Sequence, residues 1–239
     1  MKTLQKPFFI TAFCFLSGLV CIYTQQWLFR TGTDEKGLLI SAHPGGIISL
    51  LILGVVAVLL LLNLRTKYTA VFARHNLSIV GSAFAALGYG CAAWIHLSNA
   101  PLLINKLAGI MGMVSCLCAS VFVFGAAKNK KVHPLFFCPC VVFFMLHAVC
   151  RYQQWSGEPE LLRYLFPLLA SLGLMLTTYY RAAAEEAGNA GKAYLLFSRG
   201  ALFCCLAAIP GTPFAATYGA MALYILLDSF SVAKQPQEE

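Results

Sequence analysis

The sequence consists of long apolar runs that are separated by short polar segments. The hydrocarbon core of a bilayer is about 30 Å thick, and a helix needs about 20 residues to cross it. Because the runs have about this length and lack the alternation of barrel strands, they predict membrane-spanning helices. The predicted spans are residues 7–29, 46–64, 77–98, 102–127, 135–152, 161–181, 193–209 and 213–233.

The least regular of these runs is residues 193–209. It is short, and it contains Arg199. A charged side chain within the hydrocarbon core is costly, so a bundle of seven spans is the alternative to a bundle of eight.

The composition is that of a membrane protein. Of the 239 residues, 59% are hydrophobic and 11% are charged, and the mean hydropathy is +0.75. In soluble domains about a quarter of the residues are charged. We therefore predict an all-α integral membrane protein, a polytopic bundle of about eight transmembrane helices. Residues 1–239 form a single transmembrane domain in this interpretation, with a short disordered cytoplasmic tail at 234–239.

Lys and Arg are distributed unevenly between the two ends of the spans. With a cytoplasmic N-terminus, the inside segments contain Lys2, Lys6, Arg65, Lys67, Arg74, Lys128, Lys130, Lys131, Arg181, Lys192 and Lys234. The outside segments contain Arg30, Lys36, Lys106, Arg151 and Arg163. The positive-inside rule therefore predicts that both termini are cytoplasmic, which requires an even number of spans. Together with the compact loops, this favours a multi-pass protein of a bacterial plasma membrane.

The formal net charge of +8 has the same explanation. A basic balance is also typical of proteins that bind nucleic acid, but membrane proteins carry surplus Lys and Arg for topological reasons. The lipid bilayer is thus the expected partner, and nucleic acid is not.

Two stretches of the sequence resemble each other. Residues 20–27 read VCIYTQQW and residues 149–155 read VCRYQQW, with one inserted residue. They fall at the same end of the first and fifth predicted spans, which suggests a duplication into halves 1–127 and 135–233, arranged as parallel repeats. The alternative is that aromatic and amide residues gather independently at the outer ends of helices.

Polar and aromatic residues gather at the predicted outer ends of the first, third, fifth and sixth spans, among them His96. Arg151 has the planar guanidinium that binds a carboxylate or phosphate through two hydrogen bonds, and His147 precedes it by one helical turn. Tryptophan faces can stack on a ring or a cation. The candidate ligand-binding residues are Arg151, Trp155, His147, Trp27, Gln26, Glu158 and Arg163. The alternative is an interfacial belt with ordinary loop salt bridges.

Two charged residues lie well inside predicted spans, Arg199 in the seventh and Asp228 in the eighth. At a rise of 1.5 Å per residue, both lie less than about 10 Å from the inner ends of their spans. Adjacent antiparallel helices would bring them together, so we predict an intramembrane ion pair with a structural role. The alternative is a role in transport or proton relay.

Signatures of enzymes and metal sites are absent from the sequence. There is no H-E-x-x-H, G-x-S-x-G or P-loop motif, so no catalytic residue is assigned. The ten cysteines lie mostly in apolar runs and are expected to be free thiols. Cys116 and Cys118, like Cys138 and Cys140, are two residues apart, and such residues point to different sides of a helix. No metal site and no cofactor are predicted.

Three classes of function fit these observations. The leading hypothesis is a small-solute transporter, or the membrane subunit of one, with a ligand site on the extracytoplasmic side. The second is a noncatalytic scaffold, sensor or assembly subunit that binds another membrane protein. The third is a membrane enzyme that acts on lipid headgroups through Arg151, Glu158 and His147. A transporter predicts polar groups inside the bundle, a scaffold predicts them only at the rims, and an enzyme predicts carboxylate and histidine side chains in one pocket.

Overall fold

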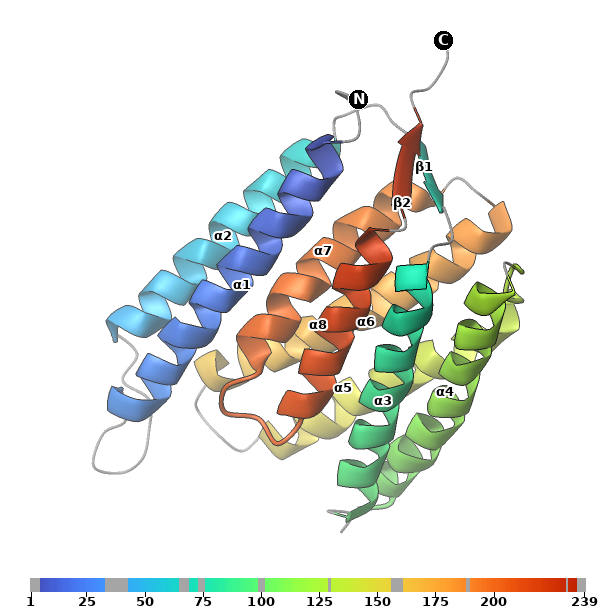
Figure 1. The fold of residues 1–239 in the computed structure, drawn as a ribbon. Coiled ribbons are helices and arrows are strands. Elements are labelled where there is room, and N and C mark those ends of the chain that lie inside the picture. The colour runs from blue at the N-terminus through green and yellow to red at the C-terminus, as the bar shows by residue number, and fades with distance from the viewer. Residues whose placement is uncertain are drawn as a thin grey trace.

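The computed structural model describes residues 5–32, 43–64, 69–72, 76–98, 102–128, 130–155, 161–187, 190–230 and 232–235. This part of the chain contains eight α-helices, so each predicted span corresponds to one helix (Figure 1). They are α1 (Gln5–Thr31), α2 (Pro44–Leu64), α3 (Asn76–Ser98), α4 (Leu103–Ala127), α5 (Cys138–Trp155), α6 (Leu161–Ala187), α7 (Gly191–Ala208) and α8 (Ala215–Ser229). A 3₁₀ turn, η1 (Pro134–Phe137), leads into α5.

A two-stranded antiparallel sheet accompanies the helices, and the hydropathy pattern does not predict it. Strand β1 (Thr69–Phe72) follows α2 and pairs with β2 (Val232–Gln235), which follows α8. The last turns of α2 and α8 therefore lie at the same end of the bundle, which we call the strand end, and the opposite end is the far end (Figure 1). Two residues of the predicted tail belong to β2, and residues 236–239 lie outside the described residues.

Six of the described helices have the length and hydropathy of a membrane span. Their apolar stretches are Phe9–Thr31, Pro44–Asn63, Asn76–Ser98, Leu103–Ala127, Pro134–Gln153 and Gly191–Ala208. The last of these is α7, which corresponds to the predicted span 193–209 that contains Arg199. It is one unbroken helix. Helix α8 has only 15 residues, so the predicted span 213–233 is too long. Turn residues precede this helix, and the chain beyond it enters β2.

Helices α3 to α8 form a closed ring. Each of them packs against the next one in the chain, and α8 packs against α3 (Figure 1). Helices α1 and α2 pair with each other outside this ring, and α1 rests chiefly on α7. At mid-height, aromatic side chains fill the interior of this ring of helices. Tyr89, Phe143 and Phe144 pack against one another there, with the centroids of their aromatic rings 5.2 to 5.4 Å apart.

Small residues let neighbouring ring helices approach closely. A Cβ added to Gly112 of α4 would lie 2.9 Å from the Cβ of Ala93 in α3, and one added to Gly173 of α6 would lie 3.1 Å from the Cβ of Ala201 in α7. In a bilayer, helices associate mainly through such close packing, since lipid offers the same apolar surroundings as another helix. These two contacts help to determine which faces of the helices meet.

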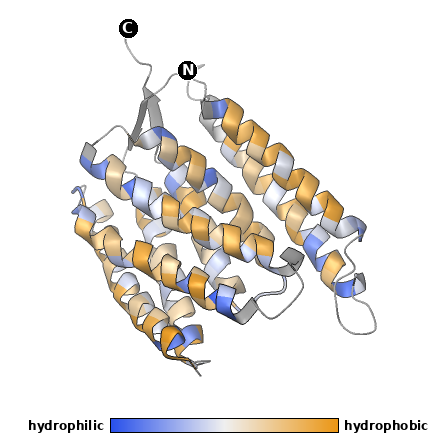
Figure 2. Ribbon diagram, turned by 180° about the vertical axis from the view of Figure 1, so that it is seen from behind, coloured by the Kyte–Doolittle hydropathy of each residue, from blue (hydrophilic) through white to orange (hydrophobic). Residues whose placement is uncertain are grey.

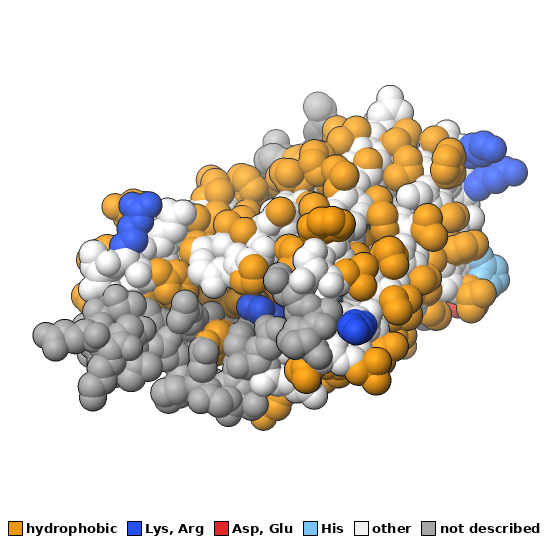
Figure 3. Space-filling view, turned by 90° about the horizontal axis from the view of Figure 1, so that it is seen from below, with side chains coloured by type: hydrophobic (Ala, Val, Ile, Leu, Met, Phe, Trp, Pro, Cys, Tyr) orange, Lys and Arg blue, Asp and Glu red, His pale blue; other side chains and the backbone are white. Residues whose placement is uncertain are grey.

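The helices consist mainly of apolar residues along most of their length (Figure 2). Large side chains such as Leu51, Val58 and Leu117 are more than half exposed. Seen from below, apolar side chains cover much of the described surface, and Lys and Arg interrupt it at a few places (Figure 3). An apolar surface of this extent is suited to contact with lipid tails, so the protein is a multi-pass membrane protein.

The helix contacts do not display two equivalent halves. All four helices of the second predicted half belong to the ring, but only α3 and α4 of the first half do. Helix α6 packs closely on α7, whereas the corresponding α2 and α3 have no such packing in the described residues. The duplication therefore stays a prediction from the resemblance of residues 20–27 to residues 149–155.

Candidate functional site

A chain of hydrogen-bonded side chains crosses the interior of the ring near the far end. His96 Nε2 of α3 lies 2.8 Å from His147 Nδ1 of α5, and His147 Nε2 lies 3.1 Å from the hydroxyl oxygen of Tyr218 in α8. That hydroxyl lies 3.3 Å from Ser171 Oγ of α6 and donates to the carbonyl oxygen of Pro167 at 3.3 Å. We call His96, His147, Tyr218 and Ser171 the histidine cluster.

The histidine cluster is almost completely excluded from solvent. His147 is 1% exposed, His96 is 3% exposed, and Tyr218 and Ser171 are buried to a similar degree. Burial of polar groups without hydrogen bonds is costly, and each of these side chains has at least one partner. Four ring helices are thus tied together by polar contacts at one level.

Arg151 lies beside the histidine cluster, one helical turn beyond His147 on α5. It is 8% exposed, and its Cζ atom lies 5.1 Å from the centroid of the Phe214 ring, just before α8. Both histidine rings contact the same phenylalanine, with centroids 4.9 Å away for His96 and 4.7 Å away for His147. An aromatic face attracts a cation, so Phe214 helps to hold the guanidinium inside the bundle.

A second polar cluster lies inside the ring near the strand end. Arg181 Nη1 of α6 lies 3.2 Å from Asp228 Oδ2 of α8, and Arg181 Nη2 lies 3.3 Å from Glu185 Oε1. The Tyr194 hydroxyl of α7 donates a hydrogen bond to the same Asp228 oxygen. We call Arg181, Glu185, Tyr194 and Asp228 the arginine–aspartate cluster.

The predicted ion pair between Arg199 and Asp228 needs a correction. The ion-pair partner of Asp228 among the described residues is Arg181. Helix α6 continues to Ala187, so Arg181 lies within the helix rather than at its last residue. The Arg199 side chain is turned toward α1, where its Nε donates to Thr11 Oγ1 at 3.1 Å. Both residues are buried, as predicted, at 0% and 2% exposure.

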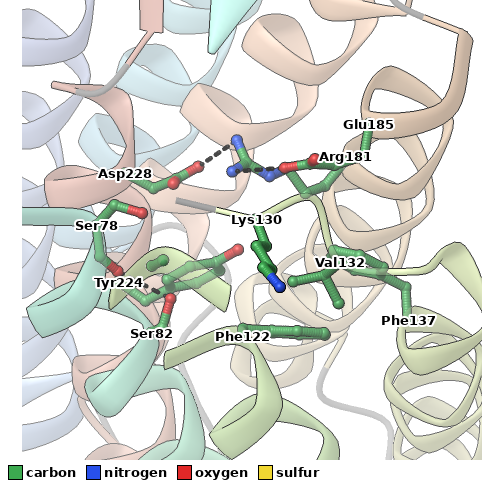
Figure 4. Close-up of a pocket in the computed structure, with 11 residues that line it drawn as sticks. Ser78, Ser82, Phe122, Lys130, Val132, Phe137, Arg181, Glu185, Tyr224 and Asp228 are labelled. Carbon is green, nitrogen blue, oxygen red and sulfur yellow. Dashed lines mark hydrogen bonds and ion pairs between the residues drawn. The ribbon is translucent and has the colours of Figure 1, made fainter. Parts of the chain in front are cut away.

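A small pocket lies beside the arginine–aspartate cluster. Ser78 and Ser82 of α3, Tyr224 of α8 and Lys130 are among the residues that line it, and the Lys130 side chain extends into it (Figure 4). Its interior volume is about 30 Å³, which is space for one or two water molecules. The pocket gives the inside of the ring a polar opening near the strand end.

The candidate residues from the sequence are only partly brought together. His147 and Arg151 lie side by side at the histidine cluster. Gln26 and Trp27 of α1 are exposed, and Trp27 packs against His43 with centroids 5.1 Å apart. Helix α1 packs on α2 and α7 rather than on α5. Residues of the predicted site that lie outside the described part are Glu158 and the side chains of Trp155 and Arg163.

Several residues of the two clusters were not predicted as site residues. Single Tyr and Ser residues such as Tyr218 and Ser171 are common in apolar runs and do not indicate a site. The spacing of four residues between Pro167 and Ser171 indicates only a local hydrogen bond, which Ser171 Oγ donates to the Pro167 carbonyl oxygen at 2.8 Å. The predicted span 161–181 places Arg181 at its inner end. Helix α6 extends beyond the predicted span to Ala187, and Arg181 contacts Asp228 from within this helix.

The described residues offer no evident metal centre. No three His, Cys, Asp or Glu side chains of the described part converge on one point. The ten cysteines are free thiols, at Cys14, Cys21, Cys91, Cys116, Cys118, Cys138, Cys140, Cys150, Cys204 and Cys205.

Comparison with models of protein families, with curated proteins and with solved structures finds no match for this chain. The argument for function therefore depends on the geometry of the two clusters.

Proposed function

We propose that the protein transports a small polar solute and that the ring of α3 to α8 is the transport unit. In this proposal all eight helices cross the membrane, including the short α8 and the amphipathic α6. The strand end lies in the cytoplasm and the far end lies outside.

The observation that carries this proposal is the position of the polar side chains. The histidine cluster and the arginine–aspartate cluster lie at opposite ends of the interior of one ring, with Tyr89, Phe143 and Phe144 between them. Ionisable groups inside membrane spans are costly and typically mark a path for a solute or an ion. A scaffold would need polar groups only at its rims, whereas these are buried among helices.

The orientation is supported by charge and by aromatic residues. Lys128, Lys130 and Lys131 lie at the strand end, where the positive-inside rule favours cytoplasm. Trp27 and Trp94 are exposed on the last turns of α1 and α3, at the far end, where tryptophan is favoured at the membrane interface.

The proposed solute site is the far-end side of the histidine cluster, and the proposed solute is a small anion. A guanidinium binds a carboxylate or phosphate with two parallel hydrogen bonds. Arg151 is held there by Phe214, next to the imidazole and hydroxyl donors of the cluster.

Thermal unfolding of the detergent-purified protein tests this site. Small carboxylates and inorganic phosphate are added at rising concentration, and a ligand that binds only the folded state raises the unfolding temperature. At 100 times its dissociation constant it adds about 2.7 kcal/mol of stability. We expect Arg151→Gln to abolish the rise.

Arg30→Gln is the matched control, because Arg30 is an exposed arginine on α1 at the same end of the molecule. It should leave the rise intact. If no anion stabilises well-folded protein, the anion-transport proposal is wrong.

The scaffold hypothesis retains one specific observation in its favour. Helix α2 packs on α1 and on α7, and its remaining surface exposes residues such as Leu51, Val55 and Leu61. Either lipid or another membrane protein fits such a face. A folded protein that binds no solute and co-purifies with a second membrane protein would favour this alternative.

A further inference from the structure

We propose that the loop between α4 and η1 binds the phosphate group of anionic phospholipids through the ammonium groups of Lys128 and Lys131. This inference concerns the outer surface of the bundle, and it does not depend on the proposed transport. It starts from three lysines, Lys128, Lys130 and Lys131, that follow the last residue of α4 within a few positions.

The loop lies at the level of the lipid headgroups. The apolar stretch of α4 ends at Ala127, and the apolar stretch that leads through α5 begins at Pro134. Phe124, in the last turn of α4, is 67% exposed, and Leu135 of η1 is 68% exposed. Large apolar side chains that are exposed on both sides of a loop are suited to lipid tails. The basic residues between the two spans therefore lie where the tails meet the headgroups.

Backbone hydrogen bonds hold the loop against the end of α4. The Lys128 amide donates to the carbonyl oxygen of Phe124 at 3.0 Å, and the Lys130 amide donates to that of Gly125 at 3.0 Å. The side chains of Lys128 and Lys131 are exposed beside this fixed backbone. Because the backbone already follows a defined path, it loses little conformational freedom when a headgroup binds.

The charges of Lys128 and Lys131 have no counter-ion within the described part of the protein. Neither side chain forms a hydrogen bond or an ion pair with a described residue. The carboxylates of Glu185 and Asp228, at the same end of the bundle, bind Arg181 instead. A lysine ammonium binds phosphate oxygens as a compact charge with three donors. Anionic phospholipids present such oxygens at the headgroup level, where they attract basic residues that adjoin a span.

Lys130 differs from the other two lysines in its direction. Its side chain extends into the small pocket that Ser78, Tyr224 and Glu185 also line (Figure 4). The Lys130 ammonium is thus directed to the interior of the ring and contributes less to a lipid site on the outer surface. The loop therefore contains a matched control, a lysine of the same charge two residues from Lys128.

Fluorescence quenching by brominated lipids tests the site. Phe136 of η1, which is 38% exposed, is replaced by Trp in a protein whose native tryptophans are changed to Phe, so that one Trp reports on the lipid beside the loop. If this protein does not fold, Leu135→Trp provides the reporter. The protein is reconstituted in vesicles in which brominated phosphatidylglycerol competes with phosphatidylcholine.

We expect phosphatidylglycerol to bind beside the loop about 25-fold more strongly than phosphatidylcholine at low salt, which is roughly fivefold for each of the two lysines. Salt screens exposed charges, so the two lipids should bind almost equally at about 1 M salt.

Single variants of the reporter protein locate the site. Lys128→Gln and Lys131→Gln should each lower the preference for phosphatidylglycerol about fivefold. Lys130→Gln should lower it less than about twofold, because its ammonium is directed into the pocket. Lys106→Gln, at an exposed position of α4 at the far end, should leave it unchanged.

The outcomes are separate from those of the transport proposal. Equal quenching by the two lipids at low salt would overturn the lipid site. Equal losses in the three loop variants would overturn the assignment to Lys128 and Lys131, since the preference would then follow total charge. Inorganic phosphate is added as a competitor at the same phosphate concentration. Retention of the lipid supports the proposal, and displacement would identify a site for a soluble anion and contradict it.

Discussion

Buried charges in this protein are satisfied by specific partners, and the choice of partner has energetic consequences. Removing one member of a buried ion pair leaves an uncompensated charge and costs about 3 to 5 kcal/mol. Replacement of both members by apolar residues is often close to neutral, since the desolvation of both charges is avoided. Arg181 and Asp228, at 8% and 2% exposure, are such a pair.

A double-mutant cycle on Arg181 and Asp228 checks this contact. We expect Asp228→Leu to lower the free energy of unfolding by about 3 kcal/mol or more. The combination with Arg181→Met should recover part of the loss, with a coupling of about 0.5 to 3 kcal/mol. Stability is measured by reversible denaturation in detergent micelles.

The same cycle with Arg199→Met in place of Arg181→Met is the comparison. Arg199 donates to Thr11 of α1 instead, so its effect should simply add to that of Asp228→Leu. A large coupling between Arg199 and Asp228 would restore the pairing that the sequence predicts and contradict the observed contact.

At the scale of elements, helix association depends on a few close approaches between backbones. The apolar residues of α1 and α2 are spread almost evenly around each helix, so no broad apolar face directs these helices to a partner. Within the ring, glycines at the contacts determine which helix faces meet. Gly112 contacts Ala93 across the α3–α4 interface, and Gly173 contacts Ala201 across the α6–α7 interface. Each allows a separation that a larger side chain would prevent.

Gly112→Ala should therefore destabilise the protein. The new Cβ would lie 2.9 Å from Ala93 Cβ and 3.1 Å from Phe143 Cε2, so α3 and α4 must move apart. We expect a loss of about 1 to 3 kcal/mol, the usual cost of overpacking, in the same denaturation assay.

Gly54→Ala is the matched control on α2. A Cβ at Gly54 meets nothing within 4 Å, and alanine favours helix more than glycine by about 1 kcal/mol. This variant should be neutral or slightly more stable. Equal losses at both positions would show that the α3–α4 contact is less tight than described.

At the scale of the whole molecule, the ring of α3 to α8 places its polar groups in two layers, and the proposed topology assigns each layer to one side of the membrane. The pairing of β1 with β2 already requires that the chain after α2 and the chain after α8 lie on one side. This agrees with an even number of spans, which the distribution of Lys and Arg predicts.

Epitope insertions test the assignment of sides. An insertion after Lys131, at the strand end, should be reached by antibody only after the cells are permeabilised. An insertion after Leu102, at the start of α4 and at the far end, should be reached in intact cells. Both epitopes on one side would contradict the eight-span topology, and reversed sides would contradict the orientation.

The sequence alone determines that this is a helical membrane protein and where its helices lie. Hydropathy over about 20 residues is a local property, and a helix in lipid satisfies its backbone hydrogen bonds within itself. The succession of His147 and Arg151 on one helical face is equally local, so half of the site was visible in the sequence. The exact end of α8 was not, because it depends on the pairing of β2 with β1.

Only the tertiary structure decided which helices form the ring and which polar groups meet inside it. The contact of His96 with His147 joins residues 51 apart in the chain, and that of His147 with Tyr218 joins residues 71 apart. Among helices that are apolar on nearly every face, the sequence pattern does not select the partner of each face. The selection comes from close packing at small residues and from the cost of leaving Arg181, Asp228 and the histidines without hydrogen bonds.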